Sequence, residues 1–259
     1  MIDLPWMCRE CPSLLSVPRL TVLYGDGGEA SKQIEKERRD LGLVTKLHSP
    51  PLPLQWGTHH SKIALLIYEN CLRVCIRTFN DVFPDVYEKS NAMYLQDFPG
   101  KSPESLAYAS KSEDDFGNDF KLQLFKYFGK CGGFDAAELD RYDFSTAAVA
   151  IVSSVPGYHS GQQLSDWGQL RLKQLLARHV KIEAEGGGQG GHGIICQASS
   201  FGNLPKKWLD DFHSTLATTT APATTKAKPP MYLVAPTVSQ IRDSVEGTAR
   251  KCAAMEQNL

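Results

Sequence analysis

Two apolar runs separated by three residues constrain the fold of this chain more than any other feature. Residues 63–68 (IALLIY) and 72–78 (LRVCIRT) each have strand-like composition, and Glu69-Asn70-Cys71 lies between them. Apolar and β-branched runs joined by so short a polar turn are typical of an antiparallel hairpin. The sequence therefore predicts a hairpin here.

The segment just before this hairpin carries the most chemically suggestive spacing. His60 and Lys62 are two residues apart, so on a strand they project from the same face. With the turn centred on Asn70, paired residue numbers sum to about 140. That register places Asn80 opposite His60 and Thr78 opposite Lys62, whereas a slip of one residue would turn Asn80 to the other face.

The rest of the chain alternates strand-like and helix-like segments, which predicts an α/β fold. Predicted strands are residues 19–24, one between 144 and 155, and 232–234; predicted helices are 29–41, 120–128, the segment from Asp166 as N-cap to His179, and a last one toward the chain end. Glycine-rich or Thr/Ala/Pro-rich composition predicts flexible loops at 184–193 and 216–230.

Length and charge limit the classes of protein to consider. A chain of 259 residues can form one large domain or two small ones, and we expect two. Lys and Arg number 28 against 29 Asp and Glu, so any nucleic-acid-binding surface must be local. Neither a secretory signal nor an apolar run of roughly 20 residues is recognisable. We therefore expect a soluble, intracellular protein, and seven cysteines, an odd number, agree with a reducing compartment.

Two further patterns have competing interpretations. Cys8 and Cys11 form a C-x-x-C without a second pair at zinc spacing, which favours two ordinary thiols over structural zinc. The glycine-rich run at 25–28 follows a predicted strand, but it lacks the spacing of a phosphate-binding loop. A plain turn is therefore the favoured interpretation.

His60, Lys62 and Asn80 form a set suited to attack on phosphorus. A neutral imidazole is a competent nucleophile, an ammonium can hold phosphoryl oxygens, and a carboxamide can donate a hydrogen bond to them. This chemistry needs no metal ion or cofactor. A lone His-x-Lys also occurs by chance, and the alternative is a half-exposed strand end.

A wider set of motifs supports the chemical interpretation. The run at 56–62 (WGTHHSK) and Thr78-Phe79-Asn80 are followed, in order, by Gly157, Trp167-Gly168, Arg171-Leu172-Lys173, the run at 197–203 (QASSFGN), Lys207-Trp208-Leu209 and Tyr232-Leu233. Together they resemble the tyrosyl-DNA phosphodiesterase 1 family, a branch of the phospholipase D superfamily, over nearly the whole chain. Ile67, where most phospholipase D relatives carry an acid, fits this branch better than the phospholipases.

The resemblance implies roles for particular residues. His60 would attack the 3′ phosphorus to form a phosphohistidine and expel tyrosine, while Lys62 and Asn80 hold the non-bridging oxygens and Asn91 adds an amide near the phosphate. Trp56 would stack on DNA, the alternative being core packing. The DNA-contacting loop would consist of Ser199, Ser200, Phe201, Gly202 and Asn203. For the two serines the alternative is a solvated turn.

The resemblance also implies an architecture and a setting. It implies phospholipase D-like α/β/α sandwiches, with residues 1–144 as a near-complete first copy and 145–259 as a truncated second copy. The expected partners are DNA with 3′-blocked ends, single- or double-stranded, and a topoisomerase-derived tyrosyl peptide as leaving group, with no membrane. The expected location is the nucleus, with the cytoplasm as a second possibility.

One expected element is missing from the sequence. The family uses a second His-x-Lys, whose histidine protonates the leaving group and then activates water. His179-Val180-Lys181 has the letters, but it closes a predicted helix, where residues two apart diverge. The chain is thus expected to carry one half-site. A non-catalytic DNA-binding module or inactive fragment is the alternative, and a phospholipase or general nuclease is less favoured.

Overall fold

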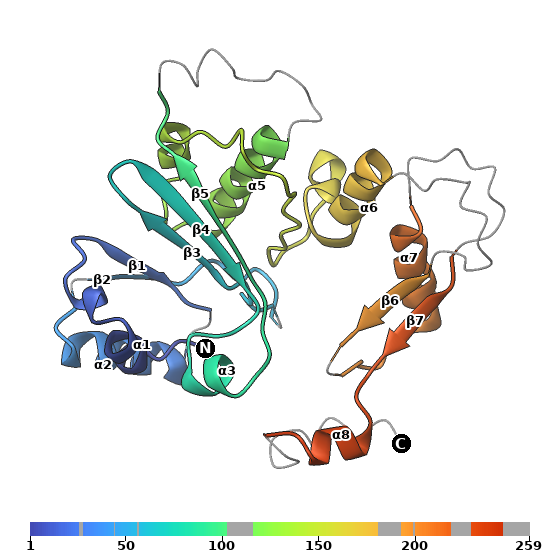
Figure 1. The fold of residues 1–259 in the computed structure, drawn as a ribbon, viewed down its shortest axis with the longest axis horizontal. Helices are drawn as coiled ribbons and strands as arrows, with labels where there is room; N and C mark the ends of the chain where they lie inside the picture. The colour runs from blue at the N-terminus through green and yellow to red at the C-terminus, as the bar shows by residue number, and fades with distance from the viewer. Residues whose placement is uncertain are drawn as a thin grey trace. The chain divides into compact units, whose positions relative to one another are not determined.

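The structure is a computed structural model that describes residues 1–25, 28–43, 45–55, 57–102, 116–180, 193–198, 200–218 and 229–245. Its contacts divide the chain into two units, Met1–Gly161 and Gln162–Leu259 (Figure 1). The domain boundary expected between residues 144 and 145 stays a prediction. The predicted loops at 184–193 and 216–230 lie largely outside the described residues. Both units combine helices and strands, which confirms an α/β protein at that level.

The first unit begins with a parallel β-α-β arrangement. Strand β1 (Leu20–Leu23), helix α2 (Glu29–Asp40) and strand β2 (Thr45–His48) follow α1 (Leu4–Glu10) and the short η1 (Pro12–Leu15). Side chains from these elements form a small core: Leu4, Cys8, Val22, Ile34 and Leu43. The predicted strand at 19–24 and helix at 29–41 are confirmed.

A three-stranded antiparallel sheet forms the larger part of the first unit. It contains β3 (Ile63–Ile67), β4 (Cys71–Arg77) and β5 (Met93–Pro99), with the short helix α3 (Phe83–Tyr87) between the last two. Helix α5 (Phe116–Cys131) packs its aromatic side on the sheet, and η2 (Ala136–Arg141) follows it.

The core between this sheet and α5 follows from alternation along β4. Leu72 and Val74 have no exposed surface, and neither has Phe98 of β5. The ring of Phe98 lies 5.2 Å from that of Phe120 in α5, centroid to centroid. Burial of these apolar side chains against α5 therefore fixes which residues of β4 project from the opposite face, Arg73 and Arg77 among them.

The hairpin is confirmed, but its predicted register is wrong by one residue. Ile63 pairs with Ile76, and the backbone N–H of Arg77 donates to the carbonyl oxygen of Lys62 at 3.0 Å. The reason is the turn, since Tyr68 N donates to Cys71 O at 2.9 Å and only two residues lie between them. Cys71 belongs to β4. Arg77, rather than Thr78, is therefore opposite Lys62.

Two other predictions are wrong. Residues 144–155 contain no strand in the structure; Val149 and Val152 are 39% and 41% exposed, so the apolar run is not the buried interior of a sheet. Asp166 is not the N-cap of its helix, because α6 (Gly168–His179) begins two residues later with Trp167 as N-cap. Asp166 instead donates its backbone N–H to Gln163 at the end of η3 (Gly161–Ser165).

The second unit also contains a parallel β-α-β arrangement. Strand β6 (Ile194–Gln197) pairs with β7 (Met231–Val234), and α7 (Lys206–Leu216) lies between them in sequence. Helix α6 contacts α7, where Gln169 donates to the Thr215 hydroxyl at 3.0 Å. Helix α8 (Val238–Arg242) follows, begun by a capping box from Thr237 to Gln240. The predicted strand at 232–234 is confirmed.

Candidate functional site

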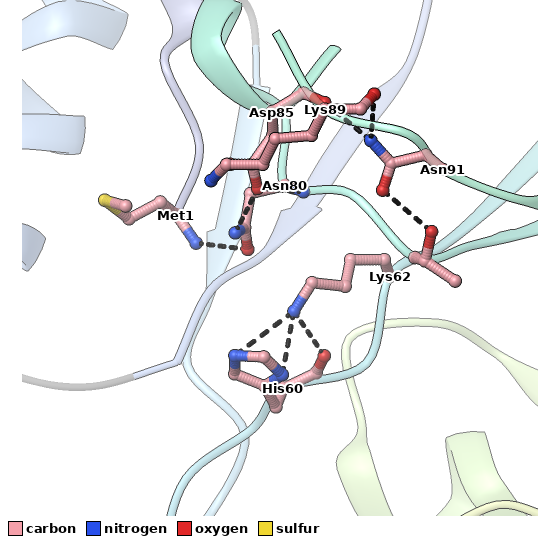
Figure 2. A network of polar contacts seen from close by, with 8 residues as sticks. Met1, His60, Lys62, Asn80, Asp85, Lys89 and Asn91 are labelled. Carbon is pink, nitrogen blue, oxygen red and sulfur yellow. Dashed lines mark hydrogen bonds and ion pairs between the residues drawn. The ribbon is translucent and has the colours of Figure 1, made fainter. Parts of the chain in front are cut away.

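His60 and Lys62 lie together just before the start of β3. The Lys62 ammonium is 2.9 Å from His60 Nδ1 and 3.3 Å from His60 Nε2, and it donates to the His60 carbonyl oxygen at 2.8 Å (Figure 2). An ammonium has only donors, so the ring nitrogen that it contacts must offer a lone pair. A ring nitrogen that accepts from this ammonium carries no proton, and an unprotonated ring nitrogen is the form that can act as a nucleophile.

The environment of Lys62 weakens its hold on its proton. Partial burial lowers the pKa of the Lys62 ammonium, and the carboxylates of Asp85 and Asp81 oppose that shift. The ammonium is thus partly desolvated, and the carboxylates of Asp85 and Asp81 act on it from a distance. An anion that approached it would replace lost hydration, which makes this position favourable for a phosphate oxygen.

Asn80 is held by a buried carboxylate. Asp85, which is 8% exposed, accepts from the backbone N–H of Asn80 at 2.9 Å and from its carboxamide Nδ2 at 2.6 Å (Figure 2). Lys89 donates to the other carboxylate oxygen at 2.7 Å. Burial raises the pKa of Asp85, but the hydrogen bonds from Lys89 and Asn80 outweigh it and hold the pKa at about 2. Asp85 is therefore charged and rigidly placed.

Asn91 is fastened to the same loop. Its Nδ2 donates to the carbonyl oxygens of Asp85 at 2.6 Å and Lys89 at 3.2 Å, and its Oδ1 accepts from the Thr78 hydroxyl at 2.8 Å. These bonds link the end of β4 to the start of β5 across α3. In the structure, Asn91 thus links the two strands through hydrogen bonds, beside Asn80 and Asp85 (Figure 2).

A cleft of about 560 Å³ in the first unit opens beside His60 and Lys62. Its wall includes α5 and residues 151–156, the segment wrongly predicted as a strand. Gln123 of α5 donates to the Ser153 hydroxyl at 2.6 Å and joins these walls. Burial raises the pKa of Tyr127 on the same helix, although a hydrogen bond with Ser61 opposes the shift. The reactive pair thus borders a cleft with largely apolar walls.

The structure brings together only part of the predicted site. His60, Lys62, Asn80 and Asn91 all lie in the first unit. Ser200, Phe201, Gly202 and Asn203 lie in the second unit, on the loop between β6 and α7, where all but Phe201 are exposed. Trp56 and Ser199 lie outside the described residues.

The structure describes only part of the second His-x-Lys, residues 179–181. His179 is the last residue of α6, and Val180 is an extended C-cap. Lys181 lies outside the described residues, so the geometry of this His-x-Lys is not defined.

Sequence reasoning missed two residues of this region. Arg77 lines the cleft with His60 and Lys62, and the error in hairpin register concealed it. Asp85 was missed because a short Phe83–Tyr87 segment gives no periodic signal of burial. The two-residue turn sets Arg77 opposite Lys62, whereas no comparable sequence signal marks the burial of Asp85.

The described part of the chain offers neither a metal-binding cluster nor a membrane-spanning helix. Within it, no group of three or more His, Cys, Asp or Glu side chains is placed to hold a metal ion. Cys8 is buried in α1, and Cys11 Sγ lies 3.1 Å from the Ser13 hydroxyl. No helix among those residues has the length and apolar character needed to cross a bilayer.

Comparison with known proteins identifies relatives of the whole chain. The family described as tyrosyl-DNA phosphodiesterase matches residues 1–256. Tyrosyl-DNA phosphodiesterase 1 of Arabidopsis thaliana is 32% identical over 262 residues, covering 96% of this chain and 41% of the relative. A probable tyrosyl-DNA phosphodiesterase of Caenorhabditis elegans is 27% identical, covering 100% of this chain and 56% of the relative.

A third relative extends the pattern. A probable tyrosyl-DNA phosphodiesterase of Schizosaccharomyces pombe is 25% identical over 61% of this chain and 39% of the relative. The chain thus spans about half the length of the curated relatives it matches. The match over residues 1–256 shows that the chain belongs to the tyrosyl-DNA phosphodiesterase family.

Proposed function

We propose that this chain carries the first half-site of a DNA-repair phosphodiesterase that cleaves the bond between a DNA 3′-phosphate and tyrosine or another 3′ adduct. The observation that carries the proposal is the direct contact between the Lys62 ammonium and the His60 ring at the edge of a cleft. The family's name supports the substrate class. The reaction would need no metal ion or cofactor.

The proposed first step forms one bond and breaks one. The unprotonated ring nitrogen of His60 attacks the phosphorus, and the bond from phosphorus to the tyrosyl oxygen breaks, with its electron pair leaving on that oxygen. Lys62 moves from the imidazole to the non-bridging oxygens, where its charge stabilises the transition state. This movement also frees the nitrogen lone pair that the ammonium contacts in the absence of substrate.

Asn80 would contribute the second donor to the phosphate. Its Nδ2 carries two hydrogens, and Asp85 accepts one of them. The other remains for a phosphoryl oxygen, and the fixed carboxylate holds the amide so that little order must be created during reaction. Asn91 would place a further amide near the phosphate, and its Nδ2 is bound to the carbonyl oxygens of Asp85 and Lys89 in the structure.

The wider proposal concerns the whole enzyme. Residues 1–144 would form one phospholipase D-like sandwich and 145–259 the start of a second. Trp56 and the loop of Ser199, Ser200, Phe201, Gly202 and Asn203 would contact DNA. A second His-x-Lys outside the recognised motifs would protonate the leaving tyrosine and activate water. The setting that we propose is the nucleus, with the cytoplasm as a second possibility and a topoisomerase-derived peptide as the leaving group.

A single-turnover experiment tests the half-site. The chain is incubated in EDTA with an oligonucleotide that ends in 3′-phosphotyrosine, and the reaction is followed by release of the tyrosine and by a protein-DNA adduct on a denaturing gel. We expect an adduct with little turnover, and we expect His60→Ala to abolish it. His59→Ala is the matched control, because His59 contacts Pro51 O at 3.4 Å instead of Lys62.

Two results would change the proposal. Persistence of the adduct in His60→Ala would remove His60 as nucleophile. Full turnover in EDTA would mean that this chain also holds the acid-base histidine.

A non-catalytic DNA-binding module is the second candidate. It keeps the cations beside the cleft, Lys62 and Arg77, but needs no nucleophilic step at His60. Salt-dependent binding of single-stranded DNA, unchanged in His60→Ala and without any adduct, would support this candidate instead.

A further inference from the structure

The observed register places two cations opposite each other at the candidate site. Arg77 N donates to Lys62 O at 3.0 Å, one step beyond the paired residues Ile63 and Ile76. Residues directly opposite in an antiparallel pair project from the same face, with Cβ atoms about 5 Å apart. Like charges in such a position destabilise a hairpin unless a counter-ion compensates them.

Asp81 is the counter-ion in the structure. Its carboxylate accepts from Arg77 Nη2 at 2.6 Å, and the two side chains are 17% and 15% exposed. The guanidinium also lies over the ring of Phe79, with 5.2 Å from its carbon to the ring centroid. Arg77 is thereby held as a stiff, partly desolvated cation at the end of β4.

The Arg77 guanidinium has unused donors. A guanidinium carries five N–H groups, and Asp81 is bound through Nη2. The buried Nε of Arg77 has no hydrogen-bond partner among the residues that the structure describes. Arg77, His60 and Lys62 all line the same cleft. This buried donor without an acceptor among the described residues lies beside a second cation and a nucleophile, a combination that suits an anionic group.

We propose that Lys62 and Arg77 together form a two-cation subsite for the phosphoryl group at the 3′ end of a DNA strand, and that Asp81 holds Arg77 in place while the subsite is empty. Arginine suits this role because its planar fork can donate two parallel hydrogen bonds to phosphate, while lysine supplies a compact charge. The choice of a DNA 3′ phosphate rests on the proposed function. The existence of the subsite does not depend on any bond being cleaved.

Equilibrium binding separates the subsite from general attraction to DNA. The probe is a fluorescein-labelled single strand that ends in a 3′-phosphate, compared with the same strand ending in a 3′-hydroxyl. We expect Arg77→Gln to weaken binding of the phosphorylated strand about tenfold or more, the loss typical of a charge-assisted hydrogen bond. Binding of the hydroxyl strand should change about twofold or less.

Arg73→Gln is the matched control. Arg73 lies on the same strand, and its substitution removes the same charge. Its Nε is 2.7 Å from Asp97 Oδ1, and neither residue lines the cleft. We expect it to affect both probes equally and weakly. Asp81→Asn should tighten binding of the phosphorylated strand, because it removes the carboxylate that competes for Arg77. A role for Arg77 in folding alone gives no reason for tighter binding.

The outcome that overturns the proposal is equal behaviour of Arg77→Gln and Arg73→Gln on the two probes. If Arg77→Gln does not fold, Arg77→Lys decides the matter, since it retains the ion pair with Asp81 but loses the fork. We expect that variant to lose affinity for the 3′-phosphate strand alone, and unchanged affinity would refute the proposal. Wild-type binding that depends on Arg77 but yields no His60 adduct would refute the proposed function and leave the subsite standing.

Discussion

The two sides of the candidate half-site differ in how their polar groups are held. On one side, His60 and Lys62 contact each other at the edge of the cleft. On the other side, the carboxamides of Asn80 and Asn91 are hydrogen-bonded to the buried carboxylate of Asp85 and to its carbonyl oxygen, respectively. The groups expected to react are thus free to exchange partners, while the groups expected to orient phosphate are fixed before substrate arrives. Substitutions should therefore affect chemistry on the first side and stability on the second.

The largest effect is expected from Lys62→Met. It removes the charge that would stabilise the phosphoryl oxygens, so the rate of adduct formation should fall by roughly a hundredfold to a thousandfold, with the fold retained. Single-turnover kinetics with the 3′-phosphotyrosyl oligonucleotide measure this rate. Lys46→Met, at the exposed position of β2, serves as the control for general loss of a lysine. A rate in Lys62→Met equal to that of the control would contradict the assignment of chemistry to the side that carries His60 and Lys62.

On the fixed side, Asp85→Ala should lower the free energy of unfolding by about 3 kcal/mol. It removes the buried carboxylate that accepts from the Lys89 ammonium and from two donors of Asn80. Urea denaturation followed by circular dichroism measures the change. Asp97→Ala, which removes an exposed acid from β5, is the control and should have little effect. Equal stability of the two variants would show that the Asp85 network is not a structural anchor.

The same network predicts how stability depends on acid. The pKa of Asp85 is about 2 in the folded chain, below its ordinary value of 3.8, so its stabilising contribution is present above about pH 4 and is lost as the pH falls toward 2. Over that interval Asp85→Ala should lose less stability than the wild-type chain. Parallel loss in both proteins would contradict the assigned role of the carboxylate.

A smaller effect is expected from Asn91→Ala. Removing its bonds to Asp85 O and from the Thr78 hydroxyl should destabilise the chain by about 1 to 2 kcal/mol. Hydrogen exchange of amides in residues 85–92 should accelerate more than that of β4. Uniform acceleration through the first unit would show that Asn91 supports the whole unit and does not act locally.

The smallest effect concerns the pH dependence of phosphate binding. Because burial lowers the pKa of Lys62, its charge is lost at a lower pH than that of an ordinary lysine, and affinity for the 3′-phosphate strand should fall correspondingly early as pH rises. Lys62→Arg should retain affinity over that range. The stability of the fold should change in the opposite direction and rise with pH. Burying the charged ammonium destabilises the fold at neutral pH, and this cost disappears above the ordinary lysine pKa. A binding profile unaltered by Lys62→Arg would contradict the prediction.

Local patterns in the sequence predicted much of the first unit. The hairpin followed from two apolar runs and a short polar turn, and α2 and β1 followed from periodicity. The register did not follow, because two-residue and three-residue turns around Asn70 fit the composition equally well. That difference of one residue exchanged Thr78 for Arg77 opposite Lys62, so the sequence indicated the reactive pair but missed the second cation.

The run at 147–152 shows a different limit of sequence reasoning. Its continuous apolar composition is typical of a buried strand, yet it forms no ladder in the structure, and its last two residues, Ile151 and Val152, line the cleft beside α5. An apolar run indicates that a segment packs against other apolar groups. It does not indicate whether the segment also pairs with a neighbouring strand. The same limit applies to Asp85, whose burial depends on contacts with Asn80 and Lys89 that no periodic pattern reveals.

Locating the covalent bond tests the central claim most directly. The wild-type chain is reacted with the 3′-phosphotyrosyl oligonucleotide, digested without acid treatment, and mapped by tandem mass spectrometry. We expect an acid-labile phosphoramidate on His60, absent from His60→Ala and retained in His59→Ala. A phosphoryl group on any other residue, or release of tyrosine with no protein adduct in single-turnover conditions, would contradict it.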